Sequence, residues 1–260
     1  MMRARGFIPM LFVLLLAAPA RADDEVWQYS TIAALLAGTY QGALTVGELK
    51  THGDLGLGTC NGLDGEMVVL DGKVWQVRTD GRPAEAADSL AVPFAAVIRF
   101  VARSTLVVPA GLDMAGLTAL LDSRIDDPTL VQAVRIDGRF ARLKVRSVPA
   151  QTPPYRPLTD IVPKEQTVFD LTEAAGTLVG FRFPPDLAGA NVAGWHLHFI
   201  AADRRTGGHV LGVTTGPARA ALDPAVRLIV QLLPGARLGK DAAAEGAAVR
   251  AVEQAPGRGN

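Results

Sequence analysis

Residues 194–213 carry three of the four histidines of this 260-residue chain. In a β-strand, residues two apart lie on the same face, so His196 and His198 point together. The polar, glycine-containing segment 203–208 predicts a turn, and the apolar run that begins at His209 predicts the returning strand of a hairpin. The window therefore predicts a half-buried β-hairpin that brings three imidazoles to one place.

Three neutral imidazoles that converge from adjacent strands form an open metal site, which leaves positions for water or substrate. We therefore expect a divalent metal, with Zn²⁺ as the first candidate, bound by His196, His198 and His209. A solitary histidine is more often a hydrogen-bonded core or surface residue. His52, at the end of a predicted short helix, fits that structural role.

Residues 1–22 have the pattern of a secretory signal peptide. Arg3 and Arg5 provide a positive start, residues 7–18 an apolar run, and a small-residue cleavage pattern ends at Ala22. The apolar run is short for a membrane-spanning helix, which disfavours an uncleaved anchor. We expect cleavage near Ala22 and export to the periplasm or out of the cell, with no membrane attachment afterwards.

The charge balance and the cysteine content limit which partners and which disulfides this chain can have. The chain has 26 Lys and Arg against 26 Asp and Glu, and three of the arginines belong to residues 1–22, so the mature chain is slightly acidic. Nothing in this balance indicates a nucleic-acid partner. The single cysteine, Cys60, allows no internal disulfide, and a buried small residue is the favoured interpretation over a thiol nucleophile.

Most of the chain predicts strands. Asp71-Gly72 and Asp137-Gly138 are strong hairpin signals. Each pair lies between two β-rich runs: 67–70 and 73–77 for the first, 131–136 and 140–148 for the second. Short helices are expected at 30–38, 45–52, 113–122 and 241–253, the third capped by Asp113. The glycine-dense segment 53–65 lacks phosphate-loop spacing and indicates close backbone approach instead.

The prolines between 149 and 163 interrupt regular structure and predict a crossing between two halves, 23–148 and 149–260. We therefore expect a strand-dominated α/β fold with a few short helices. Arg142, Lys144 and Arg146 alternate on one predicted strand, and such a basic face usually faces water.

Five blocks together resemble the α-acetolactate decarboxylase family, in its order and spacing and over nearly all of the mature chain. They are LAGTYQG (36–42), GTCNGLDGE (58–66), GTLVGFR (176–182), GWHLHF (194–199) and GGHV (207–210). The resemblance implies two α/β halves, each built around a β-sheet, a zinc site near their junction, and a homodimer. It also implies the reaction, in which 2-acetolactate (2-hydroxy-2-methyl-3-oxobutanoate) loses CO2 to give acetoin.

Carried onto this chain, the resemblance makes His196, His198 and His209 the zinc ligands. It makes Glu66 the active-site acid and Arg146 the active-site arginine. A glutamate near the C-terminus also reaches the site in this family; Glu253 matches best, with Glu245 as a rival. Cys60 stands where the family more often has an aromatic residue.

These residue types suit the reaction. Loss of CO2 from a β-keto acid leaves an enediolate, whose negative charge a zinc ion can stabilise without an organic cofactor. A guanidinium at Arg146 can hold the departing carboxylate or the developing charge. Glu66 can deliver a proton to one face of the enediolate.

Two other functions compete with this one. A cupin-like metal-dependent oxygenase or isomerase also uses a H-x-H pair, but normally with a carboxylate a few residues later, whereas residues 199–202 are Phe, Ile, Ala and Ala. An exported zinc-binding or carbohydrate-binding module would bind metal without forming acetoin. It would leave Glu66 and Arg146 away from the histidines.

Overall fold

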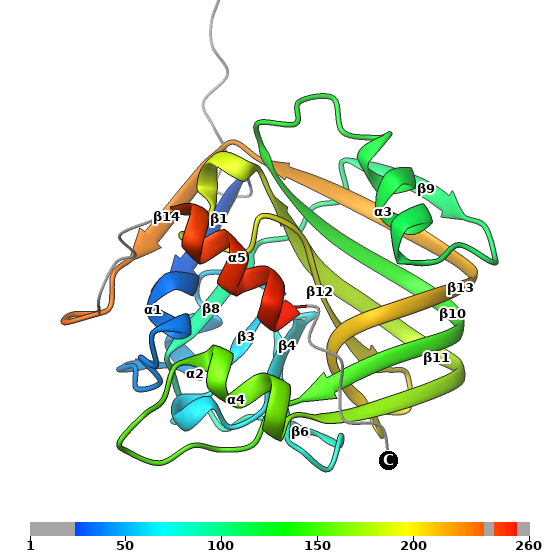
Figure 1. The fold of residues 1–260 in the computed structure, drawn as a ribbon. Helices are drawn as coiled ribbons and strands as arrows, with labels where there is room; N and C mark the ends of the chain where they lie inside the picture. Colours follow the sequence, from blue (N-terminus) through cyan, green and yellow to red (C-terminus); the bar gives the residue numbers. More distant parts are fainter. Residues whose placement is uncertain (1–23, 237–241, 254–260) are drawn as a thin grey trace, which may run out of the picture.

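A computed structural model describes residues 24–236 and 242–253 of the chain, without the side chains of 242–245 and 250. The predicted signal peptide and the tail after residue 253 lie outside these residues. The fold is strand-dominated, as the sequence predicts, with two large β-sheets and a few short helices (Figure 1). No helix within the described ranges is long and apolar enough to cross a membrane.

The first sheet has seven strands and is mixed. Their order is β14 (Arg227–Gln231), β1 (Glu25–Tyr29), β8 (Phe94–Ile98), β3 (Leu55–Thr59), β4 (Glu66–Leu70), β5 (Lys73–Val77) and β6 (Pro83–Glu85). Only β1 and β14 pair in parallel. The predicted hairpin at Asp71-Gly72 is confirmed: Leu70 pairs with Lys73, and both turn residues have positive φ, as a tight two-residue turn requires.

The second sheet curls into a closed arrangement. Its strands are β10 (Val131–Ser147), β11 (Thr167–Phe183), β12 (Gly194–Ala201), β13 (Gly207–Ala225) and β9 (Ser104–Val108), all antiparallel to their neighbours. Because β13 pairs with β10 as well as with β12 and β9, the first four strands close on themselves. Their long curved course is clear in Figure 1. A small separate sheet joins β2 (Leu44–Thr45) and β7 (Ala91–Val92).

The hairpin predicted at Asp137-Gly138 is wrong, because β10 runs through both residues as one strand. It stays paired on both sides, with Gly138 opposite Gly176 of β11 and Ala218 of β13. A Cβ on Gly138 would lie 2.4 Å from the Ala218 side chain, so the glycine permits close strand packing instead of a turn. The register against β13 shifts directly after it, as at a β-bulge.

The helices are α1 (Ile32–Leu36), α2 (Val46–Leu49), α3 (Met114–Asp122), α4 (Leu158–Glu165) and α5 (Ala242–Glu253), with short 3₁₀ turns at Asn61–Leu63 and Pro185–Leu187. Thr31 caps α1 and Asp113 caps α3 through side-chain hydrogen bonds. Thr45 and Glu48 form a capping box at the start of α2. Local sequence therefore determines where these short helices begin.

The expectation that residues 149–163 lack regular structure is wrong for α4. Pro157 precedes the helix, where its fixed φ and missing N–H cost little, while Pro163 lies inside it. Leu158, Ile161 and Val162 form a buried face, and this burial offsets the hydrogen bond that Pro163 cannot donate. Helix α4 packs beside α1 and α5.

The two sheets pack face to face through one apolar layer. Side chains alternate along β4: Val68 contacts this layer, with Phe181 of the second sheet, whereas Met67 and Val69 pack on the opposite face. Glu66 shares the face of Val68 and therefore points toward the second sheet. This alternation is what directs a carboxylate from the first sheet to the histidine hairpin.

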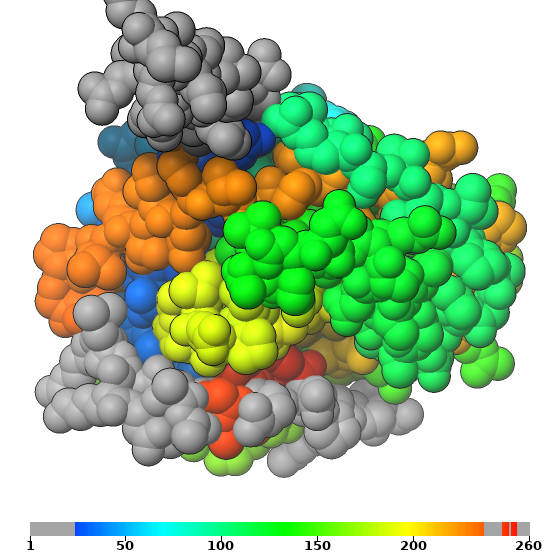
Figure 2. All heavy atoms as spheres, turned by 90° about the horizontal axis from the view of Figure 1, so that it is seen from above, coloured from blue at the N-terminus to red at the C-terminus, as the bar shows by residue number. Residues whose placement is uncertain are grey.

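The sheets do not follow the predicted division of the chain after residue 148. Strands β9 and β10 precede that residue but belong to the second sheet, while β14 follows it and extends the first sheet. From above, β14 (orange) lies on one side of the molecule and the β9 and α3 region (green) on the other (Figure 2). The two sheets are thus interleaved along the sequence.

Candidate metal centre and active site

Strand register brings three predicted site residues into one row. His198 of β12 pairs with His209 of β13, and His209 pairs in turn with Arg146 of β10. Directly opposed residues project to the same side of a sheet, so the three side chains share a face. His196 lies two residues before His198 on that same face.

Gly208 makes this register possible. Its φ is 140°, and a Cβ at this position would lie 2.3 Å from the carbonyl oxygen of Arg146. No larger residue fits between β13 and β10 here without moving the strands. The glycine next to His209 therefore has a packing reason.

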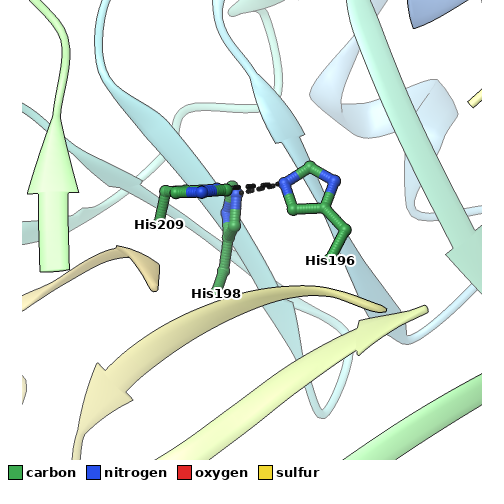
Figure 3. A group of neighbouring side chains, drawn as sticks. All are labelled: His196, His198 and His209. Carbon is green, nitrogen blue, oxygen red and sulfur yellow. Dashed lines mark hydrogen bonds between the residues drawn. The ribbon is translucent and has the colours of Figure 1, made fainter. Parts of the chain in front are cut away.

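The three imidazoles converge on one point, as Figure 3 shows. His196 Nε2 lies 3.2 Å from His198 Nε2 and 3.1 Å from His209 Nδ1. Tetrahedral zinc with bonds of about 2.0–2.1 Å holds its ligand nitrogens about 3.3–3.4 Å apart, close to these separations. All three candidate ligand nitrogens lie within 4.8 Å of one another, a spacing that suits a single metal ion.

Burial keeps the imidazoles neutral. It lowers the pKa of His196 to about 3 and holds those of His198 and His209 well below the usual value, with Arg146 adding to each shift. His198 Nδ1–H donates to the Met67 carbonyl oxygen at 2.8 Å, which leaves the Nε2 lone pair facing the other rings. Neutral rings with free lone pairs are the form that binds metals.

Arg146 is the buried cation of the site. The other two basic residues of its alternating run, Arg142 and Lys144, are exposed as predicted, but Arg146 is only 4% exposed. Its Nη1 donates to the Val252 carbonyl oxygen of α5 at 2.5 Å. Its Nε, which is buried, makes no hydrogen bond within the described residues and lies 3.7 Å from Glu66 Oε1.

Two carboxyl groups, the buried Glu66 and the partly buried Glu253, flank the histidines from opposite ends of the chain. Glu66 Oε2 lies 3.6 Å from His198 Nε2, and Glu253 Oε2 lies 3.4 Å from His209 Nε2. Burial raises the pKa of each carboxyl to about 7, although Arg146 opposes the shift. Each carboxyl can therefore hold or release a proton near neutral pH.

All six predicted site residues thus meet in one place. The side chain of Glu245, the rival of Glu253, lies outside the described residues. Cys60 is fully buried in the apolar cluster that contains Met67 and Val69, on the face of the first sheet opposite to Glu66. Burial raises the pKa of its thiol to about 12, which confirms a packing residue and not a nucleophile.

The apolar wall of the pocket was not predicted from the sequence. Helices α1, α4 and α5 supply most of this wall. Its apolar side chains are Ile32, Leu35, Leu63, Phe94, Val148, Leu158, Val162 and Val252. The only sequence signal for this wall is the apolar spacing of the short helices, which is common to any buried helix. Thr59 and Gly58 complete the lining next to Glu66.

Comparisons with known proteins all point to one family. Residues 26–237 match the family described as alpha-acetolactate decarboxylase. The chain is 46% identical to the alpha-acetolactate decarboxylase of Methanosarcina mazei over 78% of this chain and 70% of that protein. It is 42% identical to that of Raoultella terrigena over 73% of each.

A solved structure gives the same result. The crystal structure of alpha-acetolactate decarboxylase from Bacillus subtilis strain 168 superposes with a TM-score of 0.84 at 30% identity, covering 88% of this chain and 99% of that one. The strand-dominated fold is thus shared with a solved relative.

Proposed function

This chain belongs to the alpha-acetolactate decarboxylase family and is an enzyme of that class, and we propose that it acts on 2-acetolactate through a zinc ion held by His196, His198 and His209. The product is acetoin, with release of CO2. The observation that carries this proposal is the convergence of three neutral imidazoles beside an arginine that lies between two carboxyl groups.

The residues fit such a metal by their donor chemistry. Two nitrogen separations near 3.2 Å, neutral rings and a fixed His198 tautomer together provide three lone pairs aimed at one centre. The chemistry that zinc supplies when bound is Lewis-acid stabilisation of the negative charge that remains on the substrate after CO2 leaves. Imidazole ligands suit zinc, copper, nickel and iron alike, so zinc is the finer part of the proposal.

Arg146 binds the negative end of the substrate. A buried guanidinium binds a carboxylate through two parallel N–H groups. The hydrogen bond from Nη1 to the Val252 carbonyl oxygen holds the Arg146 guanidinium in place. The same charge can then stabilise the enediolate that forms as the carboxylate departs. The planar guanidinium of Arg146 contributes positive charge and orientation to the site.

Glu66 delivers the proton that completes the reaction. Its carboxyl has a pKa of about 7, so the protonated form is available at neutral pH. It reaches the site from β4, and this fixed direction of delivery predicts protonation on one face of the enediolate. Glu253 reaches the site from α5, against His209, and is the second candidate to hold a proton.

The apolar wall performs two tasks. It excludes water from the charged groups, which strengthens their electrostatic effect on the reacting centre. It also matches the substrate, because acetolactate carries methyl groups in addition to its carboxylate, hydroxyl and keto groups. The methyl groups pack against the wall while the oxygens face Arg146 and the histidines.

The competing functions have less support. A metal-binding module without catalysis predicts that Glu66 and Arg146 lie away from the histidines, whereas Glu66 lies within 4 Å of both His198 and Arg146. The hypothesis of a cupin-like oxygenase or isomerase is not supported, because the chain belongs to another family. We further propose that the protein is exported after cleavage near Ala22 and works as a homodimer.

Chelation tests the proposal directly. Purified mature protein is given racemic acetolactate, and acetoin is measured before chelation, after chelation and after zinc is restored. We expect acetoin formation to be lost and then recovered. Acetoin formation that persists after verified removal of metal would contradict the metal role, and no acetoin from the intact protein would contradict the reaction itself.

A further inference from the structure

Leu63 has a backbone conformation that leucine rarely adopts. Its φ is 58°, in the left-handed region, where a Cβ is strained. The other described non-glycine residues with positive φ are all polar or charged: Ser30, Asp71, Glu173 and Arg204. Leu63 is therefore the one apolar side chain held in this way within residues 24–236 and 242–253.

The surroundings impose this conformation. Gly62 N–H donates to the Tyr40 carbonyl oxygen at 2.7 Å, and the Gly62 carbonyl oxygen accepts from Gln151 N–H at 2.6 Å. Gly65 N–H donates to the Val148 carbonyl oxygen at 3.2 Å. Neighbouring segments thus fix the turn on both sides of Leu63, and strain can persist where the surroundings over-determine it.

The turn by itself does not require a leucine. Glycine adopts positive φ without strain, as Gly62 and Gly65 on either side of Leu63 already do, and asparagine tolerates it well. The leucine side chain is 2% exposed and lines the pocket together with Phe94, Val148 and Leu158. It comes three residues before Glu66, so the same rigid turn positions both side chains.

We propose that Leu63 is a specificity-determining residue that limits the size of the alkyl groups a substrate can carry. This inference rests on the proposed decarboxylation at the same site. The polar residues of the pocket account for the carboxylate, hydroxyl and keto oxygens of the substrate, so its alkyl groups face the apolar wall. Because hydrogen bonds fix the backbone of this turn, the Leu63 Cβ cannot shift away from the pocket, which makes Leu63 a rigid part of that wall.

The test compares Leu63→Ala with a matched control, Leu36→Ala. Leu36 belongs to the same apolar cluster and is also buried, but it does not line the pocket. Each protein is given acetolactate and two homologues, one with a propyl group in place of the C2 methyl and one with the acyl chain extended by two carbons. The readout is kcat/KM for each homologue divided by kcat/KM for acetolactate.

We expect Leu63→Ala to raise this ratio tenfold or more for at least one homologue. The wild-type wall excludes the two extra methylenes of that homologue, and removing the leucine side chain makes room for them. Leu36→Ala should leave both ratios within twofold of wild type. Unchanged ratios for Leu63→Ala, or an equal rise in the control, would overturn the inference.

A second variant covers the case in which Leu63→Ala folds poorly. Leu63→Gly removes the same side chain and relieves the positive φ, so it should show the same change in ratio. The wild-type protein separates the two levels of proposal. Wild type that forms no acetoin defeats the proposed function, whereas active wild type with unmoved ratios in both variants defeats only the role of Leu63.

Discussion

At the scale of single residues, burial distinguishes members of a repeating pattern that the sequence alone cannot tell apart. Arg142, Lys144 and Arg146 alternate along β10 and look equivalent in sequence. Only Arg146 is buried, because its end of the strand lies beneath Val252 and Glu253 of α5. A guanidinium in that position is held between two carboxyl groups, while the other two cations remain in water.

Glu66→Gln tests the role of the buried acid. The amide keeps the size of the side chain but cannot deliver a proton, so we expect turnover to fall about 10²–10⁴-fold, as for loss of a general acid. The product should also lose enantiomeric purity, which chiral chromatography of the acetoin measures. Glu85→Gln, on an exposed strand of the same sheet, is the control and should keep wild-type turnover. Full turnover and stereochemistry in Glu66→Gln would show that another group donates the proton.

Cys60 should not react with thiol reagents in the native protein. Burial raises its thiol pKa to about 12, above the ordinary value, so the thiolate is scarce at any pH below that. We expect no labelling of the native protein by iodoacetamide at pH 8.5 and complete labelling in denaturant, measured by mass spectrometry. Because the unfolded thiol loses its proton near pH 8.5–9, the contribution of Cys60 to folding stability should decrease as pH rises above that value. Rapid native labelling would contradict its burial.

At the scale of elements, the site depends on how closely three strands approach one another. Gly207 and Gly208 precede His209, and β13 passes β10 so tightly at Gly208 that a methyl group would meet the Arg146 carbonyl oxygen. A long antiparallel pairing then continues along β13 toward β9. His209 and Arg146 are therefore fixed relative to each other by backbone pairing.

Gly208→Ala should damage both stability and the metal centre. The positive φ and the 2.3 Å contact predict a loss of about 1–3 kcal/mol in unfolding free energy, measured by denaturant titration. Bound metal after dialysis should also fall, because His209 moves relative to His196 and His198. Gly212→Ala is the matched control: it lies in the same strand without a positive φ, and a Cβ there would lie 3.9 Å from the nearest atom, an ordinary contact. It should behave as wild type in both measurements. Equal stability and equal metal content in the two variants would contradict the claim that close strand packing requires glycine at position 208.

At the scale of the whole molecule, the site lies where two interleaved sheets and three helices meet. Glu66 comes from the first sheet, the histidines and Arg146 from the second, and Glu253 from the last helix. These residues lie together only when both sheets and α5 are packed. Folding therefore assembles the site that a metal would bind, and binding should in turn stabilise the fold.

The melting temperature should report this coupling. Zinc at about 1,000 times its Kd contributes about 4 kcal/mol to the native state, so chelated protein should melt several degrees lower and recover when zinc is added. His209→Ala should abolish the difference, whereas His52→Ala should retain it, since His52 stacks on Trp27 outside the site. A zinc response that survives in His209→Ala would place the metal elsewhere.

Local sequence determined several turns, helix starts and strands of this protein. The Asp71-Gly72 turn, the caps at Thr31, Thr45 and Asp113, and the H-x-H strand with its returning partner all follow from interactions within a few residues. Such interactions are complete once a short segment folds. For this reason the histidine cluster could be proposed from spacing alone, whereas Glu66, Arg146 and Glu253 required the family resemblance.

Only the tertiary structure decided the rest. The continuous course of β10 through Asp137-Gly138, the division of strands between two interleaved sheets, the apolar wall and the burial of Arg146 depend on partners far along the chain. A sequence that favours a turn stays in a strand when the segments on both of its sides remain paired with neighbouring strands. The burial of a side chain depends on which other elements of the fold pack against it. The sequence determines the chemical groups, and long-range packing determines which of them meet.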